Sequence, residues 1–141
     1  MVEMSFKLNA KLETGTFLIQ ETALSLILLS KNSLITWFLL VPKTETTEWY
    51  LLEKEQHQYL NSQICLISRF LKEHLKSDKI NIATIGNIVQ QMHIHIVGRK
   101  TDDCFWPDVI WGKKEFKEYD SEQLRILKES FLDFCLKNPL L

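Results

Sequence analysis

Glycine, proline and cysteine are all scarce in this 141-residue sequence, which has four glycines, three prolines and three cysteines. So few residues that break helices and strands indicate that most of the chain forms regular structure. The cysteines are far apart, odd in number, and form no Cys-x-x-Cys pair. This spacing argues against a disulfide framework and favours a reducing compartment.

The sequence also lacks an excess of charge of either sign and a long apolar run. Its 17 basic and 18 acidic residues give a net charge of −1, which argues against binding to a nucleic-acid polymer. The longest apolar run, residues 23–29, is shorter than the roughly 20 residues that cross a bilayer, and the first residues contain no signal-peptide core. We therefore expect a cytoplasmic protein without a membrane contact, folded as a single domain over residues 1–141.

Hydrophobic periodicity predicts five strands and two helices. The i, i+4, i+7 spacing of apolar residues predicts a long helix over 53–76, and Asp120 or Ser121 can cap a last helix that ends near residue 138. Short connections between strands favour antiparallel pairing. The predicted class is α+β, with the longer helix packed on one face of an antiparallel sheet. The expected strands are 17–19, 24–29, 37–41, 79–85 and 92–97, with a tight turn at 20–22.

Two of the four histidines, His93 and His95, lie one residue apart in the stretch VQQMHIHIVGR. Side chains alternate along a strand, so Gln91, His93 and His95 are expected to share one face, opposite an apolar face. Three interpretations are open: an exposed strand with incidental histidines, a metal site with two imidazole ligands, or a site of nucleophilic catalysis.

The residues before the histidines help to choose between a metal and a phosphate. Gly86 and Asn87 form a predicted turn directly upstream, and its backbone amides and the Asn87 side chain are suited to bind an anion. The other two histidines lie on the predicted long helix, about 25 Å apart along it, so both cannot join one metal site. The pattern therefore favours a phosphate ligand and predicts no metal site.

The segment GNIVQQMHIHIVGR (86–99) resembles the signature of the histidine triad (HIT) superfamily of nucleotide hydrolases and transferases, His-φ-His-φ-His-φ-φ, in which φ is hydrophobic. The segments SKNSLITWFLLVPK and DKINIATIGN are also similar to parts of that superfamily. The segment GRKTDDCFWPDVIWG is similar to a bacterial subgroup with a Gln-x-His-x-His motif and a Trp-Pro…Trp-Gly tail. The resemblance extends from about residue 6 to residue 112.

The resemblance implies a five-stranded antiparallel sheet with two helices, and a homodimer. It also implies a hydrolase that transfers a nucleoside monophosphate, with a purine expected as the base and no cofactor required. The substrate would be a dinucleoside polyphosphate or a nucleoside phosphoramidate. His93 would be the nucleophile, His95 would bind a phosphate oxygen or the leaving group, and Gln91 would stand in place of the first triad histidine.

The resemblance also implies contacts to substrate outside the triad. Gly86 and Asn87 would lie beside the phosphate, and Asn32 and Asn81 would lie near the ribose and the neighbouring phosphate. For Trp106, stacking on a base and simple packing are both open, and packing is expected for Trp111.

Trp37 is a second departure from the superfamily pattern, because it stands where many members have a further supporting histidine. Together with Gln91, it raises an alternative function. The protein would then be a weakly active or inactive HIT-fold module that binds a nucleotide or a partner.

Overall fold

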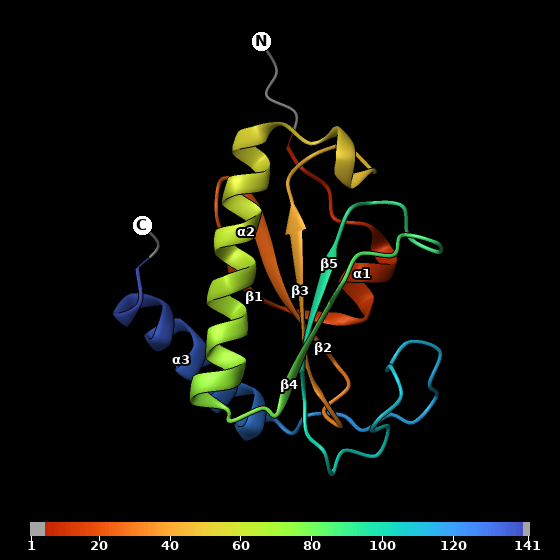
Figure 1. Ribbon diagram of the computed structural model, residues 1–141, viewed down its shortest axis with the longest axis vertical. Helices are drawn as coiled ribbons and strands as arrows, with labels where there is room; N and C mark the ends of the chain where they lie inside the picture. The colour runs from red at the N-terminus through yellow and green to blue at the C-terminus, as the bar shows by residue number, and fades with distance from the viewer. Residues whose placement is uncertain (1–4, 140–141) are drawn as a thin grey trace.

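The computed structural model describes residues 5–139, and its centre is one antiparallel sheet of five strands in the order β1-β2-β3-β5-β4 (Figure 1). Every neighbouring pair of strands is antiparallel, and β5 lies between β3 and the edge strand β4. The five-stranded antiparallel sheet confirms the predicted α+β class. The strands are β1 (Thr16–Glu21), β2 (Ser25–Ser30), β3 (Thr36–Pro42), β4 (Lys79–Ala83) and β5 (Ile94–Arg99).

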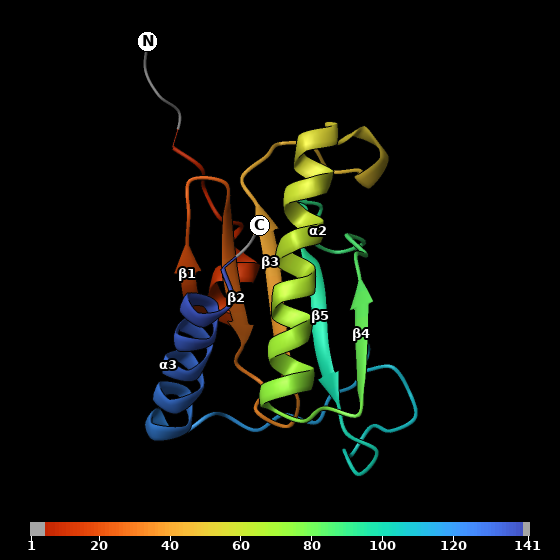
Figure 2. The same ribbon diagram turned by 60° about the vertical axis from the view of Figure 1, so that its left-hand side comes forward.

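The two long helices lie on the same side of this sheet (Figure 2). The longer helical segment consists of α2 (Lys54–Arg69) and a π-helical turn, η2 (Phe70–His74). The other long helix is α3 (Ser121–Lys137), which runs beside β1 and β2 (Figure 2). A short helix, α1 (Ala10–Thr14), and a 3-10 turn, η1 (Trp49–Leu51), complete the helical structure of the described residues.

The face under α2 and α3 holds the main hydrophobic core. Phe38 of β3 is fully buried and lies 5.1 Å from Phe131 of α3 and 6.1 Å from Phe70, measured between ring centroids. Met92, Ile94 and Ile96 belong to the same cluster, as the alternation of the sequence predicted. These contacts fix the start of β5 against the helices, and they leave the other face of β5 for the histidines.

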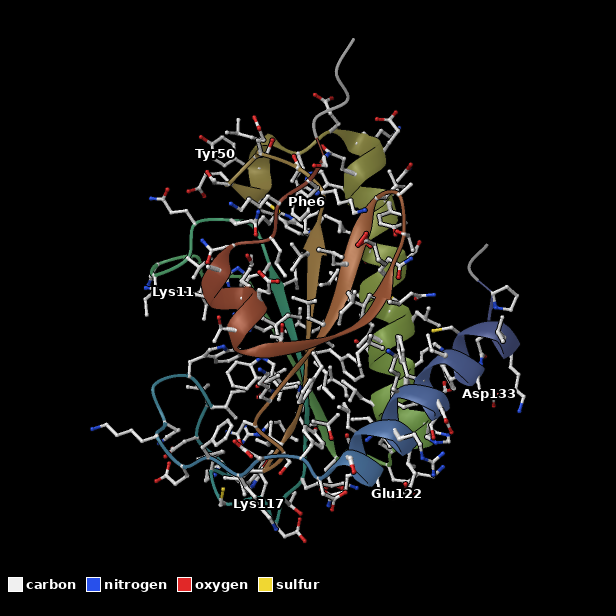
Figure 3. The ribbon with its side chains drawn as sticks, turned by 180° about the vertical axis from the view of Figure 1, so that it is seen from behind. Phe6, Lys11, Tyr50, Lys117, Glu122 and Asp133 are labelled. Atoms are coloured by element: carbon white, nitrogen blue, oxygen red, sulfur yellow. The ribbon has the colours of Figure 1, made fainter. Side chains whose placement is uncertain are left out.

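The opposite face carries two smaller apolar clusters. One is formed around Leu28, Leu39 and Val41 and is covered by α1 and the segment before it; the other is formed around Val97 and Phe105. Seen from behind, α1 lies in front of the sheet, and the irregular segment 100–118 lies beyond the end of α1 (Figure 3). In the part of the chain that the structure describes, no helix is both long and apolar enough to cross a membrane.

Most strand boundaries differ from the prediction by one or two residues. The two that concern the histidines belong to the strands predicted at 79–85 and 92–97. β5 begins at Ile94, because the carbonyl of Gln91 is hydrogen-bonded to the His93 ring and the ladder starts only after it. His93 therefore lies just before the strand. β4 ends at Ala83, the partner of His95, where its ladder with β5 ends.

The turns and helices also differ in detail. The first turn lies at 22–24 and not at 20–22, because β1 continues to Glu21 and the Thr22 hydroxyl accepts from the amides of Leu24 and Ser25. The long helix was predicted over 53–76 and ends at His74. The helix α1 was not predicted, although Asn9 is a standard N-cap and accepts from the Lys11 amide. Asp120 caps α3, as predicted.

Candidate active site

The two histidines lie where β5 enters the sheet, on the face away from α2. His95 is paired with Leu39 of β3 on one side and Ala83 of β4 on the other. The exposed fraction is 7% for His93 and 6% for His95. Their ring centroids are 4.9 Å apart at an interplanar angle of 77°. The structure therefore brings the two predicted catalytic imidazoles into direct contact in a mostly desolvated position.

The ring of His93 is oriented by its own backbone. Its Nδ1 lies 2.7 Å from the carbonyl oxygen of Gln91. A carbonyl oxygen can only accept a hydrogen bond, so Nδ1 must carry the proton. In the neutral ring Nε2 then holds the free lone pair, which is the electron pair that a nucleophile needs.

The ring of His95 has the opposite tautomer. The indole Nε1–H of Trp37 donates to Nδ1 of His95 over 2.9 Å. An indole nitrogen can only donate, so Nδ1 of His95 must be unprotonated and Nε2 must carry the proton. Burial, and then the neighbouring His93, lowers the pKa of His95 to about 4. His95 is therefore a neutral hydrogen-bond donor at neutral pH.

Trp111 completes the surroundings of His95. Its ring centroid lies 5.4 Å from that of His95 and 6.4 Å from that of Trp37. Packing was predicted for Trp111, and its ring packs directly on His95. No spacing in the sequence signals this contact, because Trp111 comes from the irregular segment that follows β5.

Gln91 connects the site to the start of the chain. Its side-chain oxygen accepts from the Asn9 amide over 2.8 Å, and its side-chain nitrogen donates to the Lys7 carbonyl over 2.9 Å. Gln91 also lines a groove of about 1310 Å³ between the N-terminal segment and the β1–β2 hairpin. Neither histidine lines this groove, so it lies beside the imidazoles and not over them.

The predicted phosphate turn lies in the loop that joins β4 to the histidines. Gly86 has a φ of 72°, in the left-handed region that favours glycine. Asn87 follows it and is exposed. The chain therefore bends at Asn87 and Ile88, directly upstream of His93, and both residues are exposed there.

Asn81 and Trp106 are associated with a buried ion pair. The Arg99 guanidinium, 2% exposed, bonds to both carboxylate oxygens of Asp103 and to the side-chain oxygen of Asn81. Trp106 lies against this guanidinium, which is 5.4 Å from the centroid of its ring. Asn81 is on the same face as His95, two residue pairs further along the ladder, where it is the partner of Val97. The ion pair of Arg99 and Asp103 was not predicted, and it holds the beginning of the irregular segment to β5.

Asn32 lies apart from the histidines, and its side chain is hydrogen-bonded to the backbone of neighbouring segments. Its side-chain oxygen accepts from the amides of Leu34 and Lys117, and its side-chain nitrogen donates to the carbonyl of Glu115. Its backbone also forms an isolated bridge with Glu118. These bonds fasten the segment that leads to α3, and the structure does not bring Asn32 into contact with the histidines.

The described residues show no arrangement of three His, Cys, Asp or Glu side chains that could hold a metal ion. The Nδ1 atoms of His93 and His95 both take part in hydrogen bonds, with the Gln91 carbonyl and the Trp37 indole respectively. The pair thus offers two Nε2 atoms, one with a lone pair and one with a proton. That combination is suited to attack an electrophile and to stabilise the charge that results.

Comparison with solved structures identifies similar proteins. A histidine triad protein from Bradyrhizobium japonicum is 34% identical and superposes with a TM-score of 0.88, covering 92% of this chain and 98% of its own. One from Marinobacter aquaeolei is 32% identical, with a TM-score of 0.87 and coverage of 94% and 97%. A diadenosine triphosphate hydrolase from Plasmodium falciparum has 16% identity, a TM-score of 0.63 and coverage of 86% and 77%, which shows a shared fold alone.

Comparison at the level of sequence gives the family. No curated protein matches the chain significantly. The HIT domain family matches residues 11–102, a range that includes Trp37, His93 and His95. Because this range is more than half of the chain, the protein belongs to the HIT domain family.

Proposed function

We propose that this HIT-domain protein is a nucleotide hydrolase or nucleotidyl transferase that cleaves at the α-phosphate. The observation that carries the proposal is the pair of buried imidazoles with opposite, fixed tautomers. The substrate would be a dinucleoside polyphosphate or a nucleoside phosphoramidate, with a purine base preferred. The HIT fold supports this choice, since a diadenosine triphosphate hydrolase has the same fold.

The proposed reaction proceeds in two steps. The lone pair on Nε2 of His93 attacks the α-phosphorus, and a bond from nitrogen to phosphorus forms as the bond to the leaving group breaks. The leaving group departs with that electron pair and takes up a proton from solvent, while Nε2–H of His95 donates a hydrogen bond to a phosphate oxygen or to the leaving group. A water molecule then attacks the phosphorus and loses a proton to solvent. The bond to His93 breaks with its electron pair returning to Nε2, and a nucleoside monophosphate is released.

The carbonyl of Gln91 would stabilise His93 during the attack. Positive charge develops on the ring as Nε2 forms its new bond, and the Nδ1–H bond to the carbonyl becomes stronger as it does so. This contribution needs only the backbone of Gln91, so it is retained although a glutamine replaces the first histidine of the triad.

Further contacts to substrate are proposed for the surrounding polar groups. The amides of the Gly86–Asn87 turn and the Asn87 side chain would bind phosphate oxygens. The side-chain nitrogen of Asn81 and the exposed edge of Trp106 would contact the nucleoside. Asn32 would act through the loop that it fastens, because its amide is already bonded to residues 34, 115 and 117.

The test is the turnover of His93→Ala with a dinucleoside polyphosphate and a nucleoside phosphoramidate. Loss of the attacking atom should reduce kcat by about a thousandfold or more, while the melting temperature and nucleotide binding stay close to the parent values. His74→Ala is the matched control, because it removes an exposed imidazole of η2 and should retain activity.

Two outcomes would count against the proposal. If His93→Ala hydrolyses these substrates as fast as the parent, His93 is not the nucleophile. If the parent binds a nucleoside monophosphate tightly and hydrolyses none of the substrates, the protein is a binding module. The observation that favours this second function is that the Gln91 side chain is hydrogen-bonded to the N-terminal segment.

We also propose that the enzyme acts as a homodimer in the cytoplasm, without a required cofactor. β4 is an edge strand whose outer side is paired with no other strand among residues 5–139, and Ile82 on it is 53% exposed. Such an edge is suited to pair with a second copy. The free thiols of Cys65 and Cys104 are compatible with a reducing compartment. Sedimentation equilibrium would support the dimer with twice the 16.6 kDa chain mass, and a single chain mass would refute it.

A further inference from the structure

The hydrogen bond from Trp37 to His95 connects a departure from the superfamily pattern to the site. Trp37 precedes the core residue Phe38 in β3, and its indole Nε1–H lies 2.9 Å from Nδ1 of His95. A histidine at this position could donate or accept, according to its own tautomer, whereas an indole can only donate. Trp37 therefore allows only one proton arrangement for this bond, with Nδ1 of His95 unprotonated.

We propose that Trp37 is a positioning residue that fixes His95 as the neutral Nε2–H tautomer, so that His95 meets the substrate as an uncharged hydrogen-bond donor. The statement about the tautomer stands on geometry alone. Its catalytic meaning rests on the proposed function, in which His95 contacts a phosphate oxygen or the leaving group.

Protonation of His95 would break this arrangement. A second proton would have to bind Nδ1, where it would point at the indole N–H, so the Trp37 bond and the charged ring exclude each other. Burial acts in the same direction, because it disfavours the charged form. The bond and the burial therefore both keep His95 neutral.

Among the residues around the His95 ring, one carries an ionisable side chain. Trp37 and Leu39 of β3, Ala83 of β4 and Trp111 carry no group that titrates near neutral pH. The remaining neighbour is His93, with its ring centroid 4.9 Å away.

A neutral His95 would favour the chemistry at His93. His93 becomes positively charged when its Nε2 bonds to phosphorus, and a charged imidazole in contact with it would oppose that step. Trp37 would thus help His93 to become positively charged by keeping its neighbour neutral. Residues from two strands, 58 positions apart in the sequence, determine the proton positions together.

The experiment is nitrogen-detected NMR of the ligand-free protein with labelled histidine, with the His95 signals assigned by their loss in His95→Gln. In the parent, Nε2 of His95 should carry the proton and Nδ1 should be unprotonated from pH 8 to pH 5. In Trp37→Phe, both tautomers should be populated. The titration midpoint of His95 in this variant should rise by about one pH unit, because the neutral form of the ring loses one hydrogen bond.

Trp111→Phe is the matched control for the ring contact. Trp111 also packs on His95 but donates no hydrogen bond to it, so this variant should keep the parental tautomer and titration midpoint. The melting temperature of each variant reports whether it is folded. The measurement on the parent decides the tautomer even if Trp37→Phe does not fold.

Kinetics give a second readout. Trp37→Phe should lower kcat by about fivefold at pH 7 with KM changed by less than about twofold, because donation to the reacting groups is affected more than binding. The variant-to-parent ratio of kcat should fall further below pH 5.5. A structural defect alone would lower the amount of active protein equally at each pH and would not produce that trend.

Three results would overturn the inference: a parental His95 protonated on Nδ1, a parental midpoint near pH 6.5, or an unchanged tautomer and midpoint in Trp37→Phe. Failure of the proposed function looks different. In that case His93→Ala would be as active as the parent, or the parent would be inactive, while the NMR result for His95 would stand.

Discussion

The two faces of the sheet differ in continuity and in chemistry. The face under α2 and α3 carries one cluster whose fourteen buried members have no group that titrates between pH 4 and 8. The opposite face carries two smaller clusters, of five and four buried residues. His95 lies between them, since its strand partner Leu39 belongs to one cluster and its face neighbour Val97 to the other.

This contrast shows how a small domain can separate stability from reactivity. The continuous face supplies most of the apolar burial, which is the main favourable contribution to folding. The divided face has fewer apolar neighbours and accommodates two imidazoles whose hydrogen bonds determine their proton positions. Substitutions on the continuous face should therefore lower the free energy of unfolding by the same amount at each pH. Substitutions on the divided face should change its pH dependence or affect only nearby residues.

The largest expected effect is the loss of stability when either of two adjacent residues of β3, one on each face, is replaced by alanine. Phe38→Ala, on the continuous face, should lower the free energy of unfolding by about 3–5 kcal/mol, and Leu39→Ala, on the divided face, by about 2–4 kcal/mol. Urea unfolding followed by circular dichroism measures both. Only Leu39→Ala should also move the NMR signals of His95. A shift of those signals in folded Phe38→Ala would show that the faces are not independent.

A smaller effect depends on pH. The pKa of His95 is lowered to about 4, first by burial and then by His93, so the unfolded chain binds a proton near pH 6.5 that the folded chain does not. Stability should therefore fall as the pH decreases through this window, by about 2 kcal/mol between pH 6.5 and pH 4.5.

His95→Gln is the variant that isolates this contribution, because glutamine does not titrate. It should lose less stability than the parent over the same pH interval, as measured by urea unfolding at both pH values. Phe38→Ala should lose the same amount as the parent. Equal losses in the parent and in His95→Gln would mean that other groups produce the pH dependence.

The smallest effect concerns the edge of the divided face. Gln91→Ala removes the two bonds to Asn9 and Lys7, and should cost about 1 kcal/mol because such bonds contribute modestly in exposed positions. Hydrogen exchange at the Asn9 amide should become faster. Gln90→Ala, at the exposed neighbouring position, is the control. Unchanged exchange in Gln91→Ala would show that α1 is held by its apolar contacts instead.

Periodicity predicted the sheet, both long helices and the apolar face of β5, because these features depend on local alternation and on burial along one element. The beginning of β5 was predicted two residues too early. The bond between the His93 ring and the Gln91 carbonyl competes with the strand ladder there, and hydrophobicity does not signal such a bond.

The structure brings together those predicted site residues that are close in sequence, and the contacts that it adds come from residues that are far apart. His93, His95 and the Gly86 turn lie within ten residues of one another, and the structure brings the two histidines into contact. The roles of Trp37 and Trp111 depend on strand pairing and on the path of an irregular segment. Asn32 and Asn81 carried no signal that their amides bond to other parts of the chain.

The position of β5 between β3 and β4 has a consequence for folding kinetics. β4 and β5 are near in sequence, and their pairing closes a short loop, whereas pairing with β3 closes a loop that contains α2 and η2. Closing the longer loop costs more chain entropy and slows folding. The bond between Trp37 and His95 spans that longer loop, so His95 should acquire its fixed tautomer only after the central strand is in place. The appearance of this tautomer during refolding would then report when the central strand has joined the sheet.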